Sequence, residues 1–165
     1  MDVLGAIGAL QGETSVKLNW DDVKRVREMT RMKMVLKGIV AGEDAALCVK
    51  HGIDGIIVSN HGGHEDASGR GTIESLPEVL QGAGGKIPVM IDSGFRGGAD
   101  IYKALALGAT AVGVGRPHIW GLSAFGQEGA ETVVAILRRE LQAIMAQTGA
   151  ASLAQIRRDS LVTKS

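Results

Sequence analysis

Four short apolar stretches divide the chain, and each is bounded by glycine, proline or aspartate. They are rich in aliphatic and β-branched residues and do not alternate between apolar and polar positions. Continuous apolar runs of this length are typical of parallel strands that are covered on both faces. The pattern therefore predicts four strands, at Met34–Ile39, Gly55–Ser59, Ile87–Asp92 and Ala111–Gly115.

A segment in which apolar residues recur with helical spacing follows each predicted strand. These four helices are expected at Glu43–Lys50, Ile73–Leu80, Ala99–Leu107 and Glu131–Gln147, the last being the longest. An amphipathic helix is also expected before the first strand, at Trp20–Thr30. The chain is expected to begin with an irregular lead-in over residues 1–19 and to end with a short helix, Ser152–Arg158, capped by Ser152.

The alternation of strands and helices places the chain in the α/β class, with right-handed crossovers and a parallel sheet. Periodicity alone leaves two architectures, an open doubly wound sheet and a barrel. Polar residues follow every predicted strand, which favours a barrel because the carboxyl ends of barrel strands form the active face. A complete TIM (β/α)8 barrel typically takes about 250 residues. The 165 residues therefore predict a single domain that is half of such a barrel, with two open sheet edges that invite pairing with another chain.

Composition narrows the class of function. Hydrophobic residues make up 45% of the chain and aromatic residues 3%, which predicts an aliphatic core. The formal net charge is zero and no basic stripe is present, which argues against a nucleic-acid partner. The single cysteine, Cys48, is expected to be a buried thiol in the reducing cytosol. No export signal is found, and no apolar run approaches the ~20 residues of a membrane helix, so a cytoplasmic protein is expected.

Two strand ends carry candidate reactive side chains. His61 directly follows a predicted strand, and Gly62 and Gly63 allow the backbone there to approach a planar ligand closely. The alternative is a loop histidine that only forms hydrogen bonds. Lys37 ends an otherwise apolar strand, where its amine can stabilise a developing anion at the mouth of the barrel. The alternative for Lys37 is a side chain that extends past the apolar surface into solvent.

Glycine-rich segments follow the third and fourth predicted strands, at Asp92–Gly98 and Gly115–Pro117. If these strands are the last two of a barrel, their loops occupy its usual phosphate site, with amides and arginines as donors. The alternative is that the glycines only form tight turns.

His51 is interpreted as a residue at a helix C-terminus, and His118 as a solvent-facing loop residue. The histidine spacing indicates no metal site, and no Gly-x-Ser-x-Gly motif indicates a serine nucleophile.

Five motifs together resemble the FMN-dependent 2-hydroxy acid oxidases and dehydrogenases, a family that includes glycolate oxidase, lactate oxidase and mandelate dehydrogenase. They occur in the family's order, and the resemblance extends from Trp20 to Val162. It implies that the chain is the C-terminal half of such a barrel. The motifs are Leu36-Lys37-Gly38, Ile57-Val58-Ser59-Asn60-His61-Gly62-Gly63, Leu76-Pro77-Glu78-Val79, Lys103-Ala104-Leu105-Ala106-Leu107-Gly108-Ala109 and Val114-Gly115-Arg116-Pro117.

The resemblance implies that FMN oxidises a small 2-hydroxy acid to a 2-oxo acid. In this reaction His61 takes the hydroxyl proton as the base, while the α-hydrogen passes to flavin N5. Lys37 matches the lysine beside flavin N1 and the C2 carbonyl, and Ser59 matches a residue that contacts the ring system. The segments that hold the ribityl chain and phosphate match Asp92, Ser93, Gly94, Phe95 and Arg96, together with Gly115 and Arg116.

The chain departs from the family pattern three residues after His61. The family usually has an arginine there that binds the substrate carboxylate through two hydrogen bonds, and this sequence has His64. Three explanations stay open: protonated His64 binds the carboxylate, Arg70 reaches inward from the same loop, or the substrate preference differs. The family's first four strands, with aromatic substrate contacts and the carboxylate that supports the base, are not among these 165 residues.

Three hypotheses about function follow. In the first, the chain is an enzyme module that supplies the base, the flavin lysine and the phosphate site. In the second, a truncated half-barrel keeps FMN or phosphate binding without turnover. In the third, it is a degenerate product with no function of its own. The expected partners are a small 2-hydroxy acid and either further copies of the chain or the missing N-terminal half-barrel.

Overall fold

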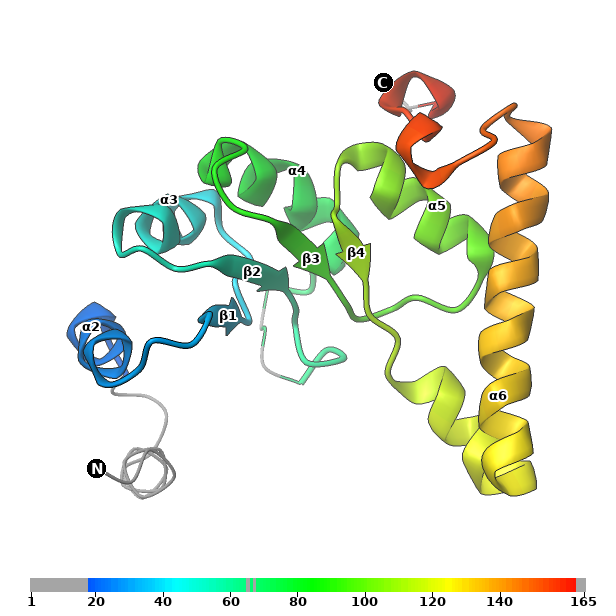
Figure 1. Cartoon of the computed structure of the whole chain (residues 1–165), viewed down its shortest axis with the longest axis horizontal. Coiled ribbons are helices and arrows are strands. Elements are labelled where there is room, and N and C mark those ends of the chain that lie inside the picture. The colour runs from blue at the N-terminus through cyan, green and yellow to red at the C-terminus, as the bar shows by residue number, and fades with distance from the viewer. Residues whose placement is uncertain (1–17, 65, 67, 163–165) are drawn as a thin grey trace.

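The computed structural model describes residues 18–64, 66 and 68–162. One parallel sheet holds four strands in chain order, so that each strand pairs with the next one along the sequence. Neighbouring strands of a (β/α) barrel are ordered in the same way. The strands are β1 (Val35–Lys37), β2 (Gly55–Val58), β3 (Val89–Ile91) and β4 (Ala111–Val112), as Figure 1 shows. Each is shorter than predicted because its ends belong to loops.

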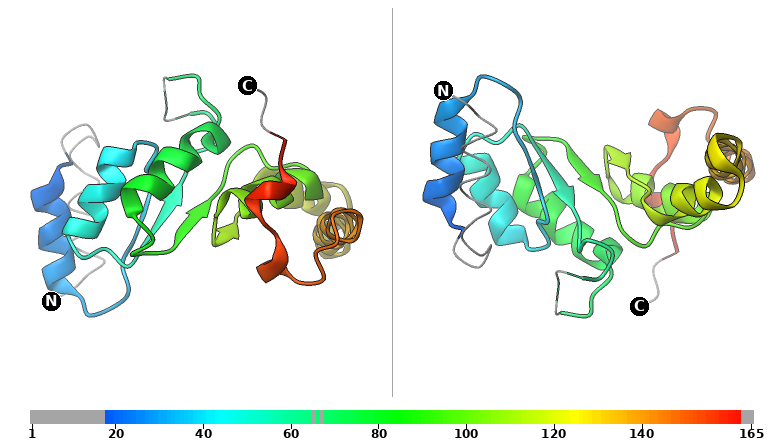
Figure 2. Two further views of the ribbon diagram at one scale, coloured as in Figure 1. Left: turned by 90° about the horizontal axis from the view of Figure 1, so that it is seen from above. Right: turned by 90° about the horizontal axis from the view of Figure 1, so that it is seen from below.

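Helices alternate with these strands as predicted. Figure 1 shows α3, α4 and α5 along one side of the sheet, with α2 at one end of the molecule and α6 at the other. In Figure 2, α6 is seen nearly end on and remains far from α2. None of the described helices is long and apolar enough to cross a membrane. The helices are α2 (Trp20–Met29), α3 (Gly42–Lys50), α4 (Thr72–Ala83), α5 (Gly98–Leu107) and α6 (Arg116–Gln147).

The lead-in before α2 falls mostly outside the described residues, which begin at position 18. Asn19 precedes the helix in an extended conformation, and its side chain accepts hydrogen bonds from the amides of Asp21 and Asp22. The Asp22 carboxylate in turn accepts a hydrogen bond from the Asn19 amide at 3.1 Å. This reciprocal capping box satisfies amides that a helix N-terminus otherwise leaves unpaired, so α2 begins where the pattern predicts.

The two faces of the sheet differ in burial. Ile56, Val58 and Ile91 are fully buried on the face that α4 contacts. The opposite face carries Val35 and Lys37, which are both exposed in the described structure. The prediction that the strands are covered on both faces is therefore wrong for this chain. The reason is geometric, because the three crossover helices all cover the same face of the sheet.

The core between the sheet and the helices is mainly aliphatic, as the composition predicts. Leu76 and Val79 of α4 are fully buried, and α3 contributes Cys48, which has 0% exposure. The predicted buried thiol is thus confirmed. Phe95 is the aromatic side chain that joins this cluster of buried residues.

Helix α6 begins fifteen residues earlier than the predicted start at Glu131, since its first residue is Arg116. It consists of two helical segments separated by non-helical residues at Phe125 and Gly126. The backbones of Gly121 and Gly129 are in direct contact, so the two segments cross with no side chain between them. The prediction that His118 lies in a loop is wrong, because a proline in the first turn is compatible with a helix start.

The predicted C-terminal helix Ser152–Arg158 is also wrong. Two short 3₁₀ turns, Leu153–Gln155 and Arg158–Ser160, replace it. Ser152 precedes the first turn, but its side chain forms no capping hydrogen bond. The segment is attached to α5 instead by a hydrogen bond of 2.9 Å from the Tyr102 hydroxyl to Ser160 Oγ.

Candidate active site

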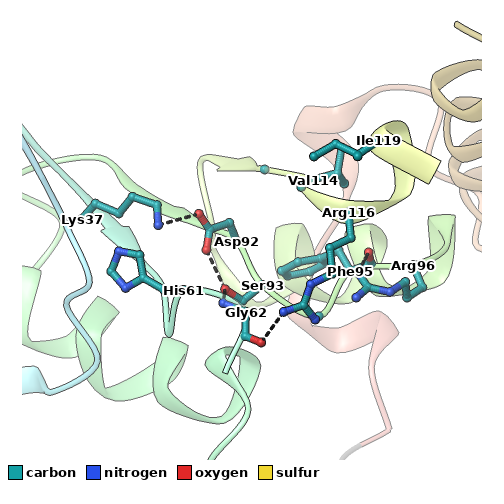
Figure 3. A pocket seen from close by; sticks show the side chains of 13 residues that line it. Lys37, His61, Gly62, Asp92, Ser93, Phe95, Arg96, Val114, Arg116 and Ile119 are labelled. Atoms are coloured by element: carbon teal, nitrogen blue, oxygen red, sulfur yellow. Dashed lines mark hydrogen bonds and ion pairs between the residues drawn. The ribbon is translucent and has the colours of Figure 1, made fainter. Parts of the chain in front are cut away.

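The loops at the ends of the four strands and the beginning of α6 line an open cavity of about 400 Å³, shown in Figure 3. This volume lies within the range of small-molecule sites in proteins. The cavity brings together residues that lie up to 82 positions apart in the chain, from Lys37 to Ile119. Nine of the predicted site residues line it: Lys37, His61, Asp92, Ser93, Gly94, Phe95, Arg96, Gly115 and Arg116.

Lys37 is oriented by two polar partners. Its Nζ donates to Ser59 Oγ at 2.9 Å and lies 3.4 Å from Asp92 Oδ2, as Figure 3 shows for the aspartate. Ser59 is only 2% exposed, so its hydroxyl is a fixed neighbour. The amine therefore faces the cavity and does not extend away from it into solvent. Ser59 does not line the cavity itself, but it supports two residues that do.

His61 lies in the loop after β2 with a φ of 52°, which is uncommon for a residue other than glycine. Its amide donates to Ser59 Oγ at 3.2 Å, and the amide of Gly62 donates to Ser93 Oγ at 3.1 Å. A Cβ atom at Gly38 would lie 3.2 Å from His61 Cε1, which places the imidazole against the end of β1. Left-handed residues persist where surrounding contacts over-determine them, and they cluster at functional sites.

Thr72, the first residue of α4, holds the loop after β3 through the carbonyl groups of that loop. Thr72 Oγ1 donates to the carbonyl oxygen of Asp92 at 2.7 Å and lies 3.1 Å from that of Ser93. Thr72 is 3% exposed. Sequence reasoning missed this residue because the predicted helix began one position later, at Ile73. A hydroxyl residue at the first position of a helix was the available signal.

Two arginines line the cavity near the start of α6. The Arg96 guanidinium lies 5.0 Å from the centre of the Trp120 ring, and its Nη1 donates to the Phe95 carbonyl at 2.8 Å. Arg116 Nη2 donates to the carbonyl oxygen of Gly62 at 2.8 Å. Two cations beside a helix N-terminus form a site that suits a phosphate group. Trp120 was not predicted, because the segment that carries it was not assigned to a helix.

The loop between β2 and α4 carries His64 and Arg70, the two residues predicted as alternative ligands of the substrate carboxylate, and it places them in different surroundings. His64 is exposed, and its Nε2 lies 3.4 Å from Arg116 Nη2. Arg70 does not reach inward, because its guanidinium donates to Glu78 Oε1 at 2.8 Å and to the Glu74 carbonyl at 3.1 Å. The explanation that Arg70 replaces the family arginine is therefore wrong for this structure. His64 is the basic residue of this loop that lies beside the cavity-lining Arg116.

His51 lies at the end of α3 as predicted, and its amide donates to the Leu47 carbonyl at 2.9 Å. Its imidazole stacks on Trp20, with 5.1 Å between ring centres and 14° between ring planes. The side chain thus packs on α2 and lies away from the cavity. Over residues 18–64, 66 and 68–162, no group of three or more histidine, cysteine or acidic side chains is arranged to hold a metal ion.

Comparison with known proteins identifies the family. Residues 3–163 match the FMN-dependent dehydrogenases. The chain belongs to this family. It is 48% identical over 132 residues to mouse 2-hydroxyacid oxidase 1, covering 80% of this chain and 36% of the relative. It is 43% identical over 155 residues to L-lactate oxidase from Lysinibacillus sphaericus, covering 94% of this chain and 40% of that relative.

The solved structures agree with the sequence relatives. A soluble mutant of the membrane-associated (S)-mandelate dehydrogenase from Pseudomonas putida superposes with a TM-score of 0.86 at 34% identity. That match covers 99% of this chain and 47% of the mandelate dehydrogenase chain. A mandelate oxidase mutant with an FMN adduct superposes with a TM-score of 0.80 at 42% identity, covering 86% of this chain and 45% of its own. The predicted family and half-barrel fold are confirmed, and the chain spans less than half the length of these relatives.

Proposed function

We propose that this chain supplies the base, the flavin lysine and the phosphate site of an FMN-dependent oxidoreductase that converts a 2-hydroxy acid to a 2-oxo acid. The observation that carries the proposal is a single cavity lined by Lys37 and His61 on one side and by Arg96 and Arg116 on the other. The relatives named as hydroxyacid and lactate oxidases support the substrate class.

The residues that line the cavity suit FMN as the cofactor. Arg96, Arg116 and the start of α6 would hold the phosphate, because guanidinium groups and helix amides both donate to anions. A Cβ atom at Gly62 would lie 2.6 Å from Arg116 Nη2, so a side chain at this position would displace the guanidinium. Bound FMN would supply the hydride acceptor at N5. The remaining proposed contacts are Asp92, Ser93, Gly94, Phe95 and Gly115 along the ribityl chain and Lys37 at the ring, where Ser59 would act through its hydrogen bond with Lys37.

His61 is proposed to accept the hydroxyl proton of the substrate on an imidazole nitrogen. A neutral imidazole serves as a general base near neutral pH, and its effect depends on being held in one orientation. The contacts of its loop with Ser59 and Ser93 provide that constraint. Lys37 is proposed to stabilise the negative charge that develops on the reduced ring, because it lines the cavity beside His61.

His64 is proposed to bind the substrate together with His61. It occupies the position of the family's carboxylate-binding arginine, and its Nε2 lies 3.4 Å from Arg116 Nη2. An imidazole N–H of His64 would donate a hydrogen bond to the substrate carboxylate. We further propose that residues 1–165 act as one domain and that the complete site includes strands beyond these four, supplied by an N-terminal half-barrel or by homo-oligomers.

The test is a titration of the chain with FMN, followed by anaerobic addition of short and aromatic 2-hydroxy acids while flavin absorbance is recorded. FMN binding is expected from residues 1–165, and substrate-dependent bleaching is expected once the remaining strands are supplied; His61→Ala should abolish that bleaching while FMN still binds. His51→Ala is the matched control, because this histidine packs on Trp20 away from the cavity. Failure to bind FMN, or bleaching that survives in His61→Ala, would contradict the proposal.

A second function is supported by the departure at position 64. With histidine in place of the arginine, and with less than half of the relatives' length present, the half-barrel would retain FMN or phosphate binding without turnover. FMN binding with no bleaching by any substrate supports this alternative. Bleaching that appears in His64→Arg but not in the natural sequence would assign the loss of turnover to this residue.

A further inference from the structure

Both amides that flank the α-carbon of His61 are bonded to serine hydroxyls. The amide of His61 itself donates to Ser59 Oγ at 3.2 Å, and the amide of Gly62 donates to Ser93 Oγ at 3.1 Å. One bond lies on the φ side of His61 and the other on its ψ side. Together they constrain both backbone torsions that set the direction of the imidazole.

The two serines are connected through one ion pair. Ser59 Oγ accepts from Lys37 Nζ at 2.9 Å, and Ser93 Oγ donates to Asp92 Oδ1 at 2.8 Å. Asp92 Oδ2 lies 3.4 Å from the same Lys37 Nζ. The contacts therefore form a closed circuit that runs from the amine through Ser59, the His61 peptide, Ser93 and Asp92 back to the amine. Figure 3 shows the part of it that joins Lys37, Asp92 and Ser93.

From this circuit we propose that Ser93 is a positioning residue for His61. A serine hydroxyl has one proton and two lone pairs. Because Ser93 donates that proton to Asp92, its lone pairs are free to accept the Gly62 amide. Asp92 thus orients the hydroxyl, and the hydroxyl fixes the peptide that follows His61. The inference rests on the proposed role of His61 as the base, and it adds a function to Ser93 beyond contact with the ribityl chain.

The backbone of the two loops supports this role. In the described part of the chain, the two residues other than glycine that have positive φ are His61 at 52° and Ser93 at 72°. Each such residue is strained and persists only where its surroundings hold it. The hydrogen bond from Gly62 to Ser93 joins the two strained loops directly. Thr72 holds the loop that contains Ser93 through the carbonyls of Asp92 and Ser93.

The test compares Ser93→Ala with Ser93→Gly in the full chain without FMN. Alanine removes the hydroxyl and keeps the Cβ atom in the left-handed conformation, whereas glycine removes both and relieves the backbone strain. Ser123→Ala on the exposed surface of α6 is the matched control. Solvent exchange of the Gly62 amide and the chemical shift of the His61 Cε1 proton are followed by NMR, with His51 as the internal reference.

Both Ser93 variants are expected to speed Gly62 amide exchange by about fivefold to tenfold, the effect of losing one typical hydrogen bond. Both should also change the chemical shift of the His61 Cε1 proton while that of His51 stays in place. Ser123→Ala should change neither. If the Ser93 variants leave the Gly62 exchange and the His61 chemical shift unaltered, the inference is overturned. The NMR measurements need no flavin. A failure of this inference can therefore be distinguished from a failure of the proposed oxidation.

Discussion

Arg116 Nη2 lies 2.8 Å from the carbonyl oxygen of Gly62 and donates a hydrogen bond to it, although the two residues are 54 positions apart. The bond connects the start of α6 to the loop that carries His61. The proposed phosphate end of the cavity is therefore hydrogen-bonded to the loop of its proposed base. An anionic ligand that moves Arg116 would also move the carbonyl group next to the base.

Replacement of Arg116 should weaken FMN binding and loosen the His61 loop. Arg116→Ala is expected to raise the Kd for FMN by about tenfold or more, the usual effect of losing a hydrogen bond to a charged group. Arg116→Lys should recover only part of the affinity, because an ammonium lacks the planar fork of donors. Arg138→Ala, an equal charge change on the exposed side of α6, is the control. An unchanged Kd in Arg116→Ala would rule out its role at the phosphate.

Gly38→Ala should impair the site through His61. Gly38 has a φ of 98°, and the added Cβ atom would lie 3.2 Å from His61 Cε1. Gly52 has a φ of 69°, with no atom within 4 Å of an added Cβ, so Gly52→Ala carries backbone strain without the contact. Both variants should lose about 1–3 kcal/mol of unfolding free energy, measured in urea. Only Gly38→Ala is expected to shift the His61 resonance, and an equal response from Gly52→Ala would contradict this account.

Stability should fall at alkaline pH because of Cys48. Burial, aided by the negative charge of Asp44, raises the pKa of this thiol from 9.0 to about 11. The unfolded chain releases the proton first, so the contribution is fully present below pH 9 and is lost as the pH rises to about 11. Urea unfolding across this window should show a decline that Cys48→Ala lacks. A thiol reagent should modify Cys48 slowly until urea unfolds the chain, and fast modification of the folded chain would oppose this prediction.

The opposite dependence is expected of Asp54 at acid pH. Hydrogen bonds from Lys33 and from the Met34 amide hold the pKa of this carboxyl below its ordinary 3.8, with smaller help from the charges of Lys33 and Arg27. Its contribution to stability is therefore present above pH 3.8 and lost as the pH falls below that value. Asp54→Asn should flatten the acid limb of unfolding measured by circular dichroism. Asp159→Asn serves as the control, and an equal effect from it would count against this role of Asp54.

The order of the elements was predictable because local patterns determine it. Short aliphatic runs between glycine and proline predicted all four strands, and each crossover helix follows its strand. The burial of Cys48 followed from helical spacing in the same way. Motif order identified the family, since several matches in sequence are far more specific than one. These inferences need only neighbours along the chain.

Contacts between distant segments could not be predicted. Gly62 and Ser93 are 31 positions apart, and their bond depends on two left-handed residues that no pattern indicates. The early start of α6 was missed because a glycine followed by Arg116 and Pro117 is also typical of a loop. The uncovered face of the sheet was missed because an apolar run does not reveal which of its two sides the helices cover.

The positions of the two tryptophans have an optical consequence. Trp20 stacks on the His51 imidazole between α2 and α3, whereas Trp120 lies against the Arg96 guanidinium at the cavity. The sequence contains only these two indoles, so Trp20→Phe leaves one fluorophore beside the proposed phosphate site. Trp120→Phe leaves the other one stacked on the His51 imidazole, away from the cavity. The chain thus contains two separate emission probes, one for occupancy of the cavity and one for the packing of α2 on α3.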